Sequence, residues 1–272
     1  MGKPIKLPKL VHLLFTIMVK IHSNTIWYPH MRNAFYSAVF TLSFFTTAHF
    51  GQSQNATNQP SVQLLKSREI SILAFNSVWT GVNYFAFRNA PIIPKNPIYN
   101  KIPGLDNFHR YSLNKNVSLV SDATGILTCL AGAFMVMKQP KNEILAKGMI
   151  MGQSLWMSVN MAQTVKQLTL RARPYTRAPG VIPTKKDDFY SFYSGHSAAV
   201  ASIATSAWLM RNKGNGSLSV NGQKTIPIVC TILGISTALL RIYAGKHYPS
   251  DVLCGITTGI GIAYINYRIH EK

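Results

Sequence analysis

The feature that most constrains the fold of this chain is a series of six long segments that carry almost no charge. They are residues 70–87, 117–137, 148–165, 197–210, 226–240 and 252–266, and the single charged residue among them is Asp122. None shows the strict alternation of apolar and polar residues that is typical of a half-buried strand. Because their β-branched residues are interspersed with Ala, Gly, Leu and Met, we expect helices. Six such helices predict an all-α bundle.

These segments also bear on whether the chain enters a membrane. A membrane-spanning helix needs about 20 predominantly apolar residues, and several of the segments are shorter and contain polar side chains. Charged residues make up 13% of the chain, well below the ~25% of a typical soluble domain. We therefore expect a membrane-embedded bundle, with a soluble or peripherally attached periplasmic domain as the alternative. Lys and Arg occur on both sets of alternating loops, so loop charge does not give the orientation.

The first part of the chain has the layout of a secretory signal peptide. After Met31 come a basic residue, an apolar core at residues 38–45 and, at residues 51–53, small residues of the kind found at a cleavage site. We expect translation to start at Met31, with residues 1–30 as an upstream extension; an uncleaved anchor at residues 33–50 is the alternative. The predicted organisation is an N-terminal extension with signal peptide or anchor at 1–53, a polar linker at 54–69 and a helical domain at 70–272.

The charge balance of the chain is strongly basic. It has 28 Lys and Arg against 8 Asp and Glu, a formal net charge of +20. This balance favours anionic partners, namely nucleic acid, an acidic membrane surface or phosphorylated substrates. Because the sequence has no zinc-finger spacing, RNA-binding aromatic signature or basic helix, we expect no nucleic-acid partner. No feature of the sequence predicts a protein partner.

A first motif lies at the end of the third segment, where Lys166 and Arg173 are followed by Pro174. Two residues seven apart share a face of a helix, and we expect Pro174 to end that helix and turn Arg173 inward. A lysine and an arginine that converge at a helix end suit a phosphate group. The alternative is that both cations only extend to a membrane surface.

A second motif, Ser194-Gly195-His196, opens the fourth segment. Gly195 allows close approach of the backbone to a ligand, and the N–H groups that open a helix form an anion site. His196 beside them is a candidate acid or base near neutral pH. The alternative is an ordinary helix N-terminus.

A third motif bridges the fifth and sixth segments and contains Arg241, His247 and Asp251. Asp251 follows Pro249, a residue favoured in the first turn of a helix. A carboxylate that accepts from one ring nitrogen of His247 leaves the other free to act as a nucleophile. The alternative is a structural His–Asp helix cap.

The positions of the three motifs agree with one another. If the helices alternate in direction, the end of the third, the start of the fourth and the link between the fifth and sixth lie at the same end of the bundle. We therefore predict a single phosphate-sized pocket lined by the two histidines and the three cations.

At these positions the sequence resembles the type 2 phosphatidic acid phosphatase superfamily, which includes the vanadium haloperoxidases. The signature of that family is Lys-x6-Arg-Pro, then Pro-Ser-Gly-His, then Ser-Arg-x5-His-x3-Asp. The first element is complete here, whereas Tyr193 replaces the Pro of the second and Leu240 replaces the Ser of the third. Neither change removes a side chain to which the chemistry is assigned.

The resemblance implies a catalytic cycle through a phosphohistidine. His247 would attack phosphorus while Asp251 holds its ring, and His196 would protonate the leaving oxygen and then activate water. The phosphate-binding residues that it implies are Lys166, Arg173, Arg241, Ser194 and Gly195. The family requires no metal or other cofactor, and the sequence offers no acidic cluster that would hold Mg²⁺.

The substrate that the resemblance implies is a phosphomonoester or pyrophosphate of a membrane lipid, such as phosphatidic acid, undecaprenyl pyrophosphate or lipid A. We expect a multi-pass protein of the bacterial cell envelope with its site on the periplasmic face, and the loop at residues 175–192 at the mouth of the site. The alternatives are a soluble periplasmic acid phosphatase, a non-catalytic phospholipid-binding or transport protein, and a vanadium haloperoxidase.

Overall fold

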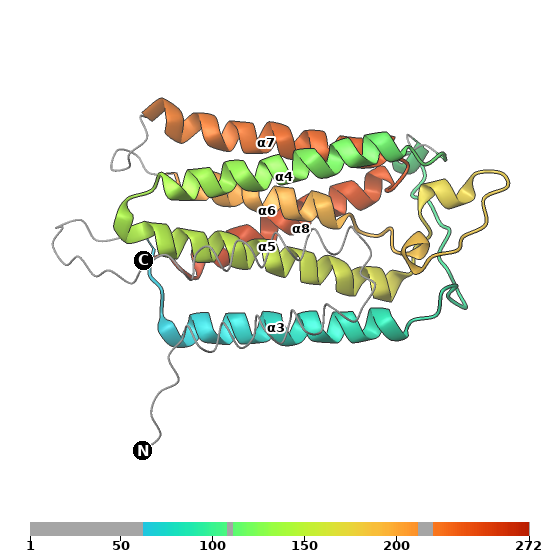
Figure 1. Cartoon of the computed structure of the whole chain (residues 1–272), viewed down its shortest axis with the longest axis horizontal. Helices are drawn as coiled ribbons and strands as arrows, with labels where there is room; N and C mark the ends of the chain where they lie inside the picture. Colours follow the sequence, from blue (N-terminus) through green and yellow to red (C-terminus); the bar gives the residue numbers. More distant parts are fainter. Residues whose placement is uncertain (1–61, 108–110, 212–219, 272) are drawn as a thin grey trace, which may run out of the picture. The chain divides into compact units, whose positions relative to one another are not determined.

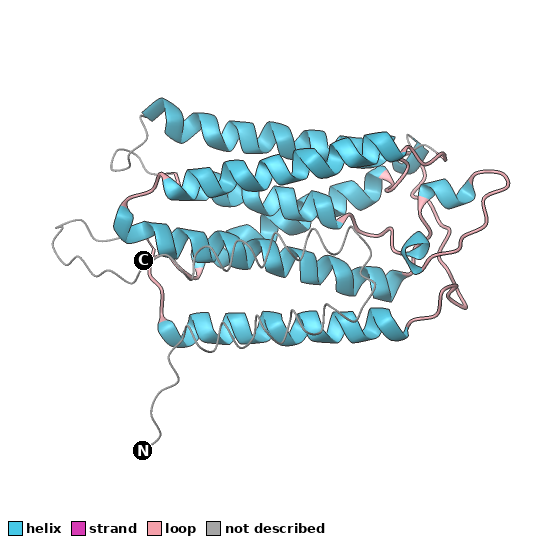
Figure 2. Cartoon of the chain, in the orientation of Figure 1, coloured by secondary structure: helices cyan, strands magenta, loops and turns pink. Residues whose placement is uncertain are grey.

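A computed structural model describes residues 62–107, 111–211 and 220–271 of the chain. Within these ranges the secondary structure is helical, with two isolated β-bridges and no strand (Figure 2). The predicted all-α bundle of six helices is confirmed (Figure 1). Its helices are α3 (Lys66–Asn89), α4 (Lys115–Met137), α5 (Lys141–Thr169), α6 (Gly195–Leu209), α7 (Val220–Tyr243) and α8 (Pro249–Arg268). Three short 3-10 helices lie in the loops: η1 (Leu105–Asn107), η2 (Pro174–Arg177) and η3 (Lys186–Phe189).

The helices are longer than the uncharged segments that predict them. α3 begins at Lys66, within the predicted linker at 54–69, and α7 begins at Val220, ahead of the uncharged segment at 226–240. Lys, Arg and Gln are good helix formers. Helices that are predicted from uncharged segments alone are therefore too short, because charged residues at the helix ends are left out. The predicted start at Met31 and the signal peptide or anchor at residues 33–50 lie outside the described residues.

α6 is the central helix, because it packs against α4, α5, α7 and α8 (Figure 1). Its contact with α8 is close enough to exclude side chains at two glycines of α8. A Cβ atom at Gly255 would lie 2.5 Å from the Ser194 carbonyl oxygen, and one at Gly259 would lie 2.1 Å from the Ala198 carbonyl oxygen. Small residues at such a crossing let two helix backbones approach each other. The close contact fixes the start of α6 against the first half of α8.

α3 is attached to α5 through a row of polar contacts. Trp79 Nε1 donates to Thr164 Oγ1 at 2.8 Å, and Asn83 Nδ2 donates to the Asn160 carbonyl oxygen at 3.0 Å. Inside a bilayer the hydrophobic effect does not drive helices together, and interhelical hydrogen bonds of this kind help to hold them. The large apolar side chains that α3 exposes are Ile70, Phe75, Val78, Val82 and Phe85.

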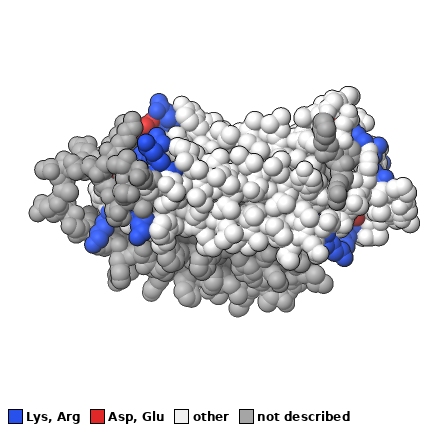
Figure 3. All heavy atoms as spheres, turned by 90° about the horizontal axis from the view of Figure 1, so that it is seen from above, with Lys and Arg blue, Asp and Glu red and all other residues white. Residues whose placement is uncertain are grey.

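Two of the described helices, α4 and the Gly222–Tyr243 part of α7, are long and apolar enough to cross a membrane by length and composition. On the face shown in Figure 3, Lys and Arg gather at the two ends of the described surface and leave an uncharged band between them. Exposed apolar residues of these two helices include Leu119 and Ile126 of α4 and Ile232 and Leu239 of α7. Extended apolar surface of this kind marks a contact with lipid or protein.

Candidate active site

The three sequence motifs meet at one end of the bundle, where α5 ends, α6 begins and α7 connects to α8 (Figure 1, right). Arg241 Nη2 lies 2.8 and 3.0 Å from the two ring nitrogens of His196. The Ser194 N–H donates to the Asp251 carbonyl oxygen at 3.0 Å, and Arg173 Nη1 donates to the Lys246 carbonyl oxygen at 3.2 Å. The predicted meeting of the motifs at one end is confirmed.

Arg173 reaches the site by a different route from the one predicted. α5 ends at Thr169, because Leu170 adopts the left-handed conformation with φ 47°. Arg173 therefore lies in extended backbone before η2, and the prediction that it shares a helix face with Lys166 is wrong. Its guanidinium nevertheless turns inward and is buried.

Lys166 and the start of α6 lie next to each other. A Cβ atom added to Gly195 would be 3.7 Å from Lys166 Nζ, so the ammonium group borders the first turn of α6. The N–H groups of that turn have no partner within the helix and favour an anion. The Ser194 hydroxyl caps α6 by accepting from the Ser197 N–H at 3.3 Å and the Ser197 hydroxyl at 2.8 Å. Ser194 thus contributes to the anion site by fixing the helix start.

His247 and Asp251 are close but not hydrogen-bonded. His247 Nδ1 is 3.6 Å from Asp251 Oδ2, beyond normal hydrogen-bond distance. Asp251 Oδ2 instead accepts from the Tyr248 N–H at 2.9 Å and from the Ser191 hydroxyl. Burial, reinforced by the cations Arg173 and Lys166, holds the pKa of His247 well below its usual range. The imidazole is therefore neutral near pH 7, as a nucleophile requires.

Arg171 is a residue that the motif analysis missed. Its buried guanidinium contacts Asp251 Oδ1, donates to Ser250 Oγ at 2.8 Å and lies 2.7 Å from Asp106 Oδ2. Residues two apart in an extended segment normally point to the same side, but Arg171 and Arg173 have different partners. Arg171 binds the acid behind His247, and Arg173 faces Asp187. The feature of the sequence that could have identified Arg171 is the basic run at 171–173.

Asp122 of α4 is a second missed residue. Its Oδ1 atom lies 3.1 Å from His196 Nε2 and 2.9 Å from Arg241 Nη1. Asp122 is conspicuous in the sequence, because it is the single charged residue of the segment at 117–137. A charged group in such a segment is normally paired or functional.

The loop at residues 175–192 contributes an anion to the site. Asp187 Oδ1 lies 2.8 Å from Arg173 Nη2, and the Asp187 carbonyl oxygen accepts from Arg173 Nε at 2.7 Å. Burial acts to raise the pKa of Asp187, but Arg173, Lys166 and Lys246 together hold that pKa well below its usual range. Asp187 is therefore ionised among the cations of the site.

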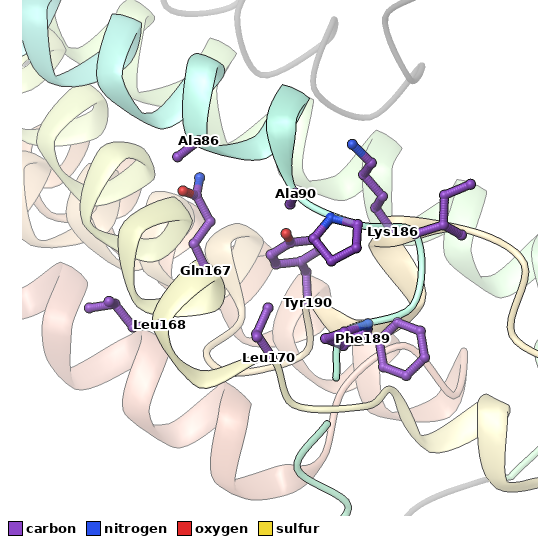
Figure 4. A pocket seen from close by; sticks show the side chains of 11 residues that line it. Ala86, Ala90, Gln167, Leu168, Leu170, Lys186, Phe189 and Tyr190 are labelled. Atoms are coloured by element: carbon purple, nitrogen blue, oxygen red, sulfur yellow. The ribbon is translucent and has the colours of Figure 1, made fainter. Parts of the chain in front are cut away.

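An apolar cavity of about 310 Å³ lies beside this loop, between the ends of α3 and α5 (Figure 4). Lys186 at its rim donates from Nζ to the carbonyl oxygens of Phe87 at 3.1 Å and Arg88 at 2.7 Å, so its charge caps α3. The other labelled lining residues are Ala86, Ala90, Gln167, Leu168, Leu170, Phe189 and Tyr190. None of the predicted site residues lines this cavity.

The family model described as the PAP2 superfamily matches residues 147–272. The match covers the C-terminal part of the chain, a little under half of its residues. The PAP2 match contains all three motifs and confirms the family resemblance of the sequence, whereas Asp106 and Asp122 precede it.

Among solved structures, the chain is similar to the crystal structure of the first transmembrane PAP2 type phosphatidylglycerolphosphate phosphatase from Bacillus subtilis. The identity is 18% and the TM-score 0.42, over 86% of this chain and 96% of that chain. No curated protein matches the chain. The match to the PAP2 superfamily supports phosphatase activity in general.

Proposed function

We propose that the protein hydrolyses a phosphomonoester or pyrophosphate of a membrane lipid, through a phosphohistidine on His247. The observation that supports this best is the convergence at one end of the bundle of two imidazoles, the buried guanidinium groups of Arg173 and Arg241, and the half-buried Lys166. Because the surroundings of His247 keep it neutral, it has a lone pair for attack on phosphorus.

The reaction has two displacements at phosphorus. His247 attacks, the bond from phosphorus to the leaving oxygen breaks, and His196 gives a proton to that oxygen. Water then attacks the phosphohistidine while His196 takes a proton from it, and the phosphorus–nitrogen bond breaks. Inorganic phosphate leaves and both histidines return to their starting protonation states.

The cations act on the phosphoryl oxygens during both steps. Lys166, Arg173 and Arg241 stabilise the negative charge that develops there, and the first-turn N–H groups of α6 add to this. Lys246, next to the nucleophile in sequence, adds a fourth positive charge, and its ammonium lies 5.6 Å from the Tyr175 ring centroid. We propose that this phosphate chemistry proceeds without a metal ion.

A lipid substrate is supported by the apolar surface of α4 and α7 and by the uncharged band of Figure 3. A lipid phosphate enters such a site sideways while its acyl chains stay in the bilayer. We propose a place in the bacterial cell envelope with the site on the periplasmic face. Fusion of a reporter that is active only in the periplasm, at residue 215 and at the C-terminus, tests this orientation.

Phosphate release from phosphatidic acid, undecaprenyl pyrophosphate and p-nitrophenyl phosphate, with EDTA present, tests the function. We expect activity that survives the chelator, inhibition by vanadate, and loss of at least about 10³-fold in His247→Ala, which lacks the nucleophile. Acid-labile label from ³²P-substrate should be trapped on His247. Label on His196, or activity abolished by EDTA, would contradict the proposed mechanism. If the protein hydrolyses p-nitrophenyl phosphate but neither of the two lipids, the alternative of a soluble acid phosphatase is favoured.

A further inference from the structure

We propose that Asp122 is a positioning residue for the general acid, forming with His196 a second carboxylate–imidazole pair beside that of His247 and Asp251. This inference rests on the proposed function and assigns a role to a helix outside the matched PAP2 region. The first pair would serve the nucleophile and the second the leaving group.

The contacts of Asp122 define the pair. One oxygen, Oδ1, lies 3.1 Å from His196 Nε2 and 2.9 Å from Arg241 Nη1, so it joins α4 to both α6 and α7. One turn earlier in α4, Ser118 Oγ accepts from Arg241 Nη1 at 3.2 Å. The Asp122 side chain is 17% exposed, which places an acid in the interior of a helix that is otherwise apolar. Such an acid is costly unless it is paired.

Hydrogen-bond chemistry assigns the roles within the pair. An arginine has donors and no acceptor, whereas a neutral imidazole has one of each. A carboxylate oxygen can only accept, so the proposed pair requires the proton of His196 on Nε2, and Nδ1 then accepts from Arg241 Nη2 at 2.8 Å. Asp122 therefore selects the tautomer and the orientation of His196, as a carboxylate does for other catalytic histidines.

Both nitrogens of His196 are thus engaged before any phosphate arrives. When a phosphoryl group draws Arg241 to its own oxygens, Nδ1 is released, takes up a proton from solvent and can pass it to the leaving oxygen. Asp122 keeps its contact with Nε2 and stabilises the imidazolium that must form before a proton is given away. Without Asp122, Arg241 and His196 would lose the oxygen that both share.

The charges around His196 make this carboxylate necessary. The charged groups that act on it are Arg241 from α7, Lys166 from α5 and Asp122 from α4, and the imidazole of His247 lies near. Two of these are cations that oppose protonation of His196, and Asp122 is the group that favours it.

The test compares two leaving groups in the full-length protein carrying Asp122→Asn. The leaving group of p-nitrophenyl phosphate departs without a proton, whereas the alkoxide of phosphatidic acid needs one. We expect kcat to fall on the order of 10²-fold for phosphatidic acid and less than about 5-fold for p-nitrophenyl phosphate. The basic limb of the kcat profile for phosphatidic acid should move to lower pH. An equal loss on both substrates with an unchanged pH profile would show a purely structural role and overturn the proposal.

Two further measurements complete the test. Ser118→Ala removes a contact to Arg241 and leaves His196 untouched, so it should raise KM for both substrates alike and leave the ratio of the two kcat values unchanged. Histidine-selective ¹⁵N NMR reports the tautomer of His196 without any turnover. Loss of the Nε2–H tautomer in Asp122→Asn supports the pair, and an unchanged spectrum refutes it. If wild-type protein hydrolyses neither substrate, the proposed function fails while the NMR result still decides the pairing.

Discussion

Arg173 and Asp187 form an ion pair of 2.8 Å inside the candidate active site, so a cation that is assigned to phosphate already holds an anion of the protein. The carboxylate is ionised because the cations around it lower its pKa against the effect of burial. A phosphoryl group that binds Arg173 must therefore compete with Asp187 for the guanidinium.

Asp187→Asn should tighten the binding of phosphate-like anions, because it removes a negative charge that opposes them. We expect the inhibition constants of orthovanadate and inorganic phosphate to fall roughly 3- to 10-fold, the equivalent of about one unit charge at a partly screened distance. Inhibition curves at fixed pH and salt measure this effect. Glu271→Gln, which neutralises an acid outside the site, is the matched control and should leave both constants unchanged. Weaker inhibition in Asp187→Asn would mean that Asp187 serves mainly to hold Arg173 in place.

The environment of His247 predicts an unusual acidic limb for the reaction. The folded pKa of His247 lies well below the ordinary value of 6.5, because burial and then Arg173 and Lys166 oppose its protonation. The reactive neutral form is lost only as pH falls through this lowered pKa. After correction for ionisation of the substrate phosphate, kcat/KM should stay level from pH 7 to below pH 6. An acidic limb centred near 6.5 would show that His247 is solvated rather than buried among cations.

Lys246 predicts a basic limb in substrate binding. Burial, and then repulsion by Arg173, lowers the pKa of Lys246 to about 8. As pH rises through that value the ammonium loses its charge, so kcat/KM should decline above pH 8 with most of the change in KM. In Lys246→Arg the guanidinium stays charged to above pH 12, and the part of the limb due to this residue should disappear. A limb of unchanged position and depth in the variant would assign it to another group.

The spacing of the motifs predicted which residues lie together, but not the backbone conformation that positions each of them. The uncharged segments gave the helices, and their alternation placed Lys166, His196 and His247 at one end. The position of Arg173 was not predictable from spacing, because the left-handed Leu170 ends α5 after Thr169, and leucine is not a usual residue for a left-handed helix end. A seven-residue interval fits both a continuous helix and a helix followed by extended chain.

The residues that support the site were harder to predict, because their partners are distant in sequence. Asp122 stood out as an isolated acid, but nothing in the order of residues linked it to His196. Asp106 lies in η1 between α3 and α4, outside the predicted helices and motifs, and it accepts from the Ser250 N–H at 2.9 Å. Such pairings depend on which helices lie side by side, and one sequence carries little information on that point.

Arg171 is the residue whose loss should damage the fold most, because it serves two buried acids. Its guanidinium lies against Asp106 and Asp251, whose side chains have no exposed surface. Arg171→Ala would leave both carboxylates in the interior without their cation, at a cost of about 3–5 kcal/mol for breaking a buried pair. We expect a clearly lower melting temperature in detergent, together with loss of activity because Asp251 no longer stays fixed behind His247.

A surface arginine provides the comparison for this loss. Arg268 pairs with Glu271, and its side chain is 58% exposed, so Arg268→Ala should cost less than about 1 kcal/mol. In Arg171→Lys one ammonium replaces a guanidinium that contacts two acids at once, and a point charge cannot reproduce that fork. This variant should melt between wild type and Arg171→Ala. Equal melting temperatures for Arg171→Ala and Arg268→Ala would mean that Asp106 and Asp251 are held by their other hydrogen bonds, and that Arg171 contributes little to the position of the nucleophile.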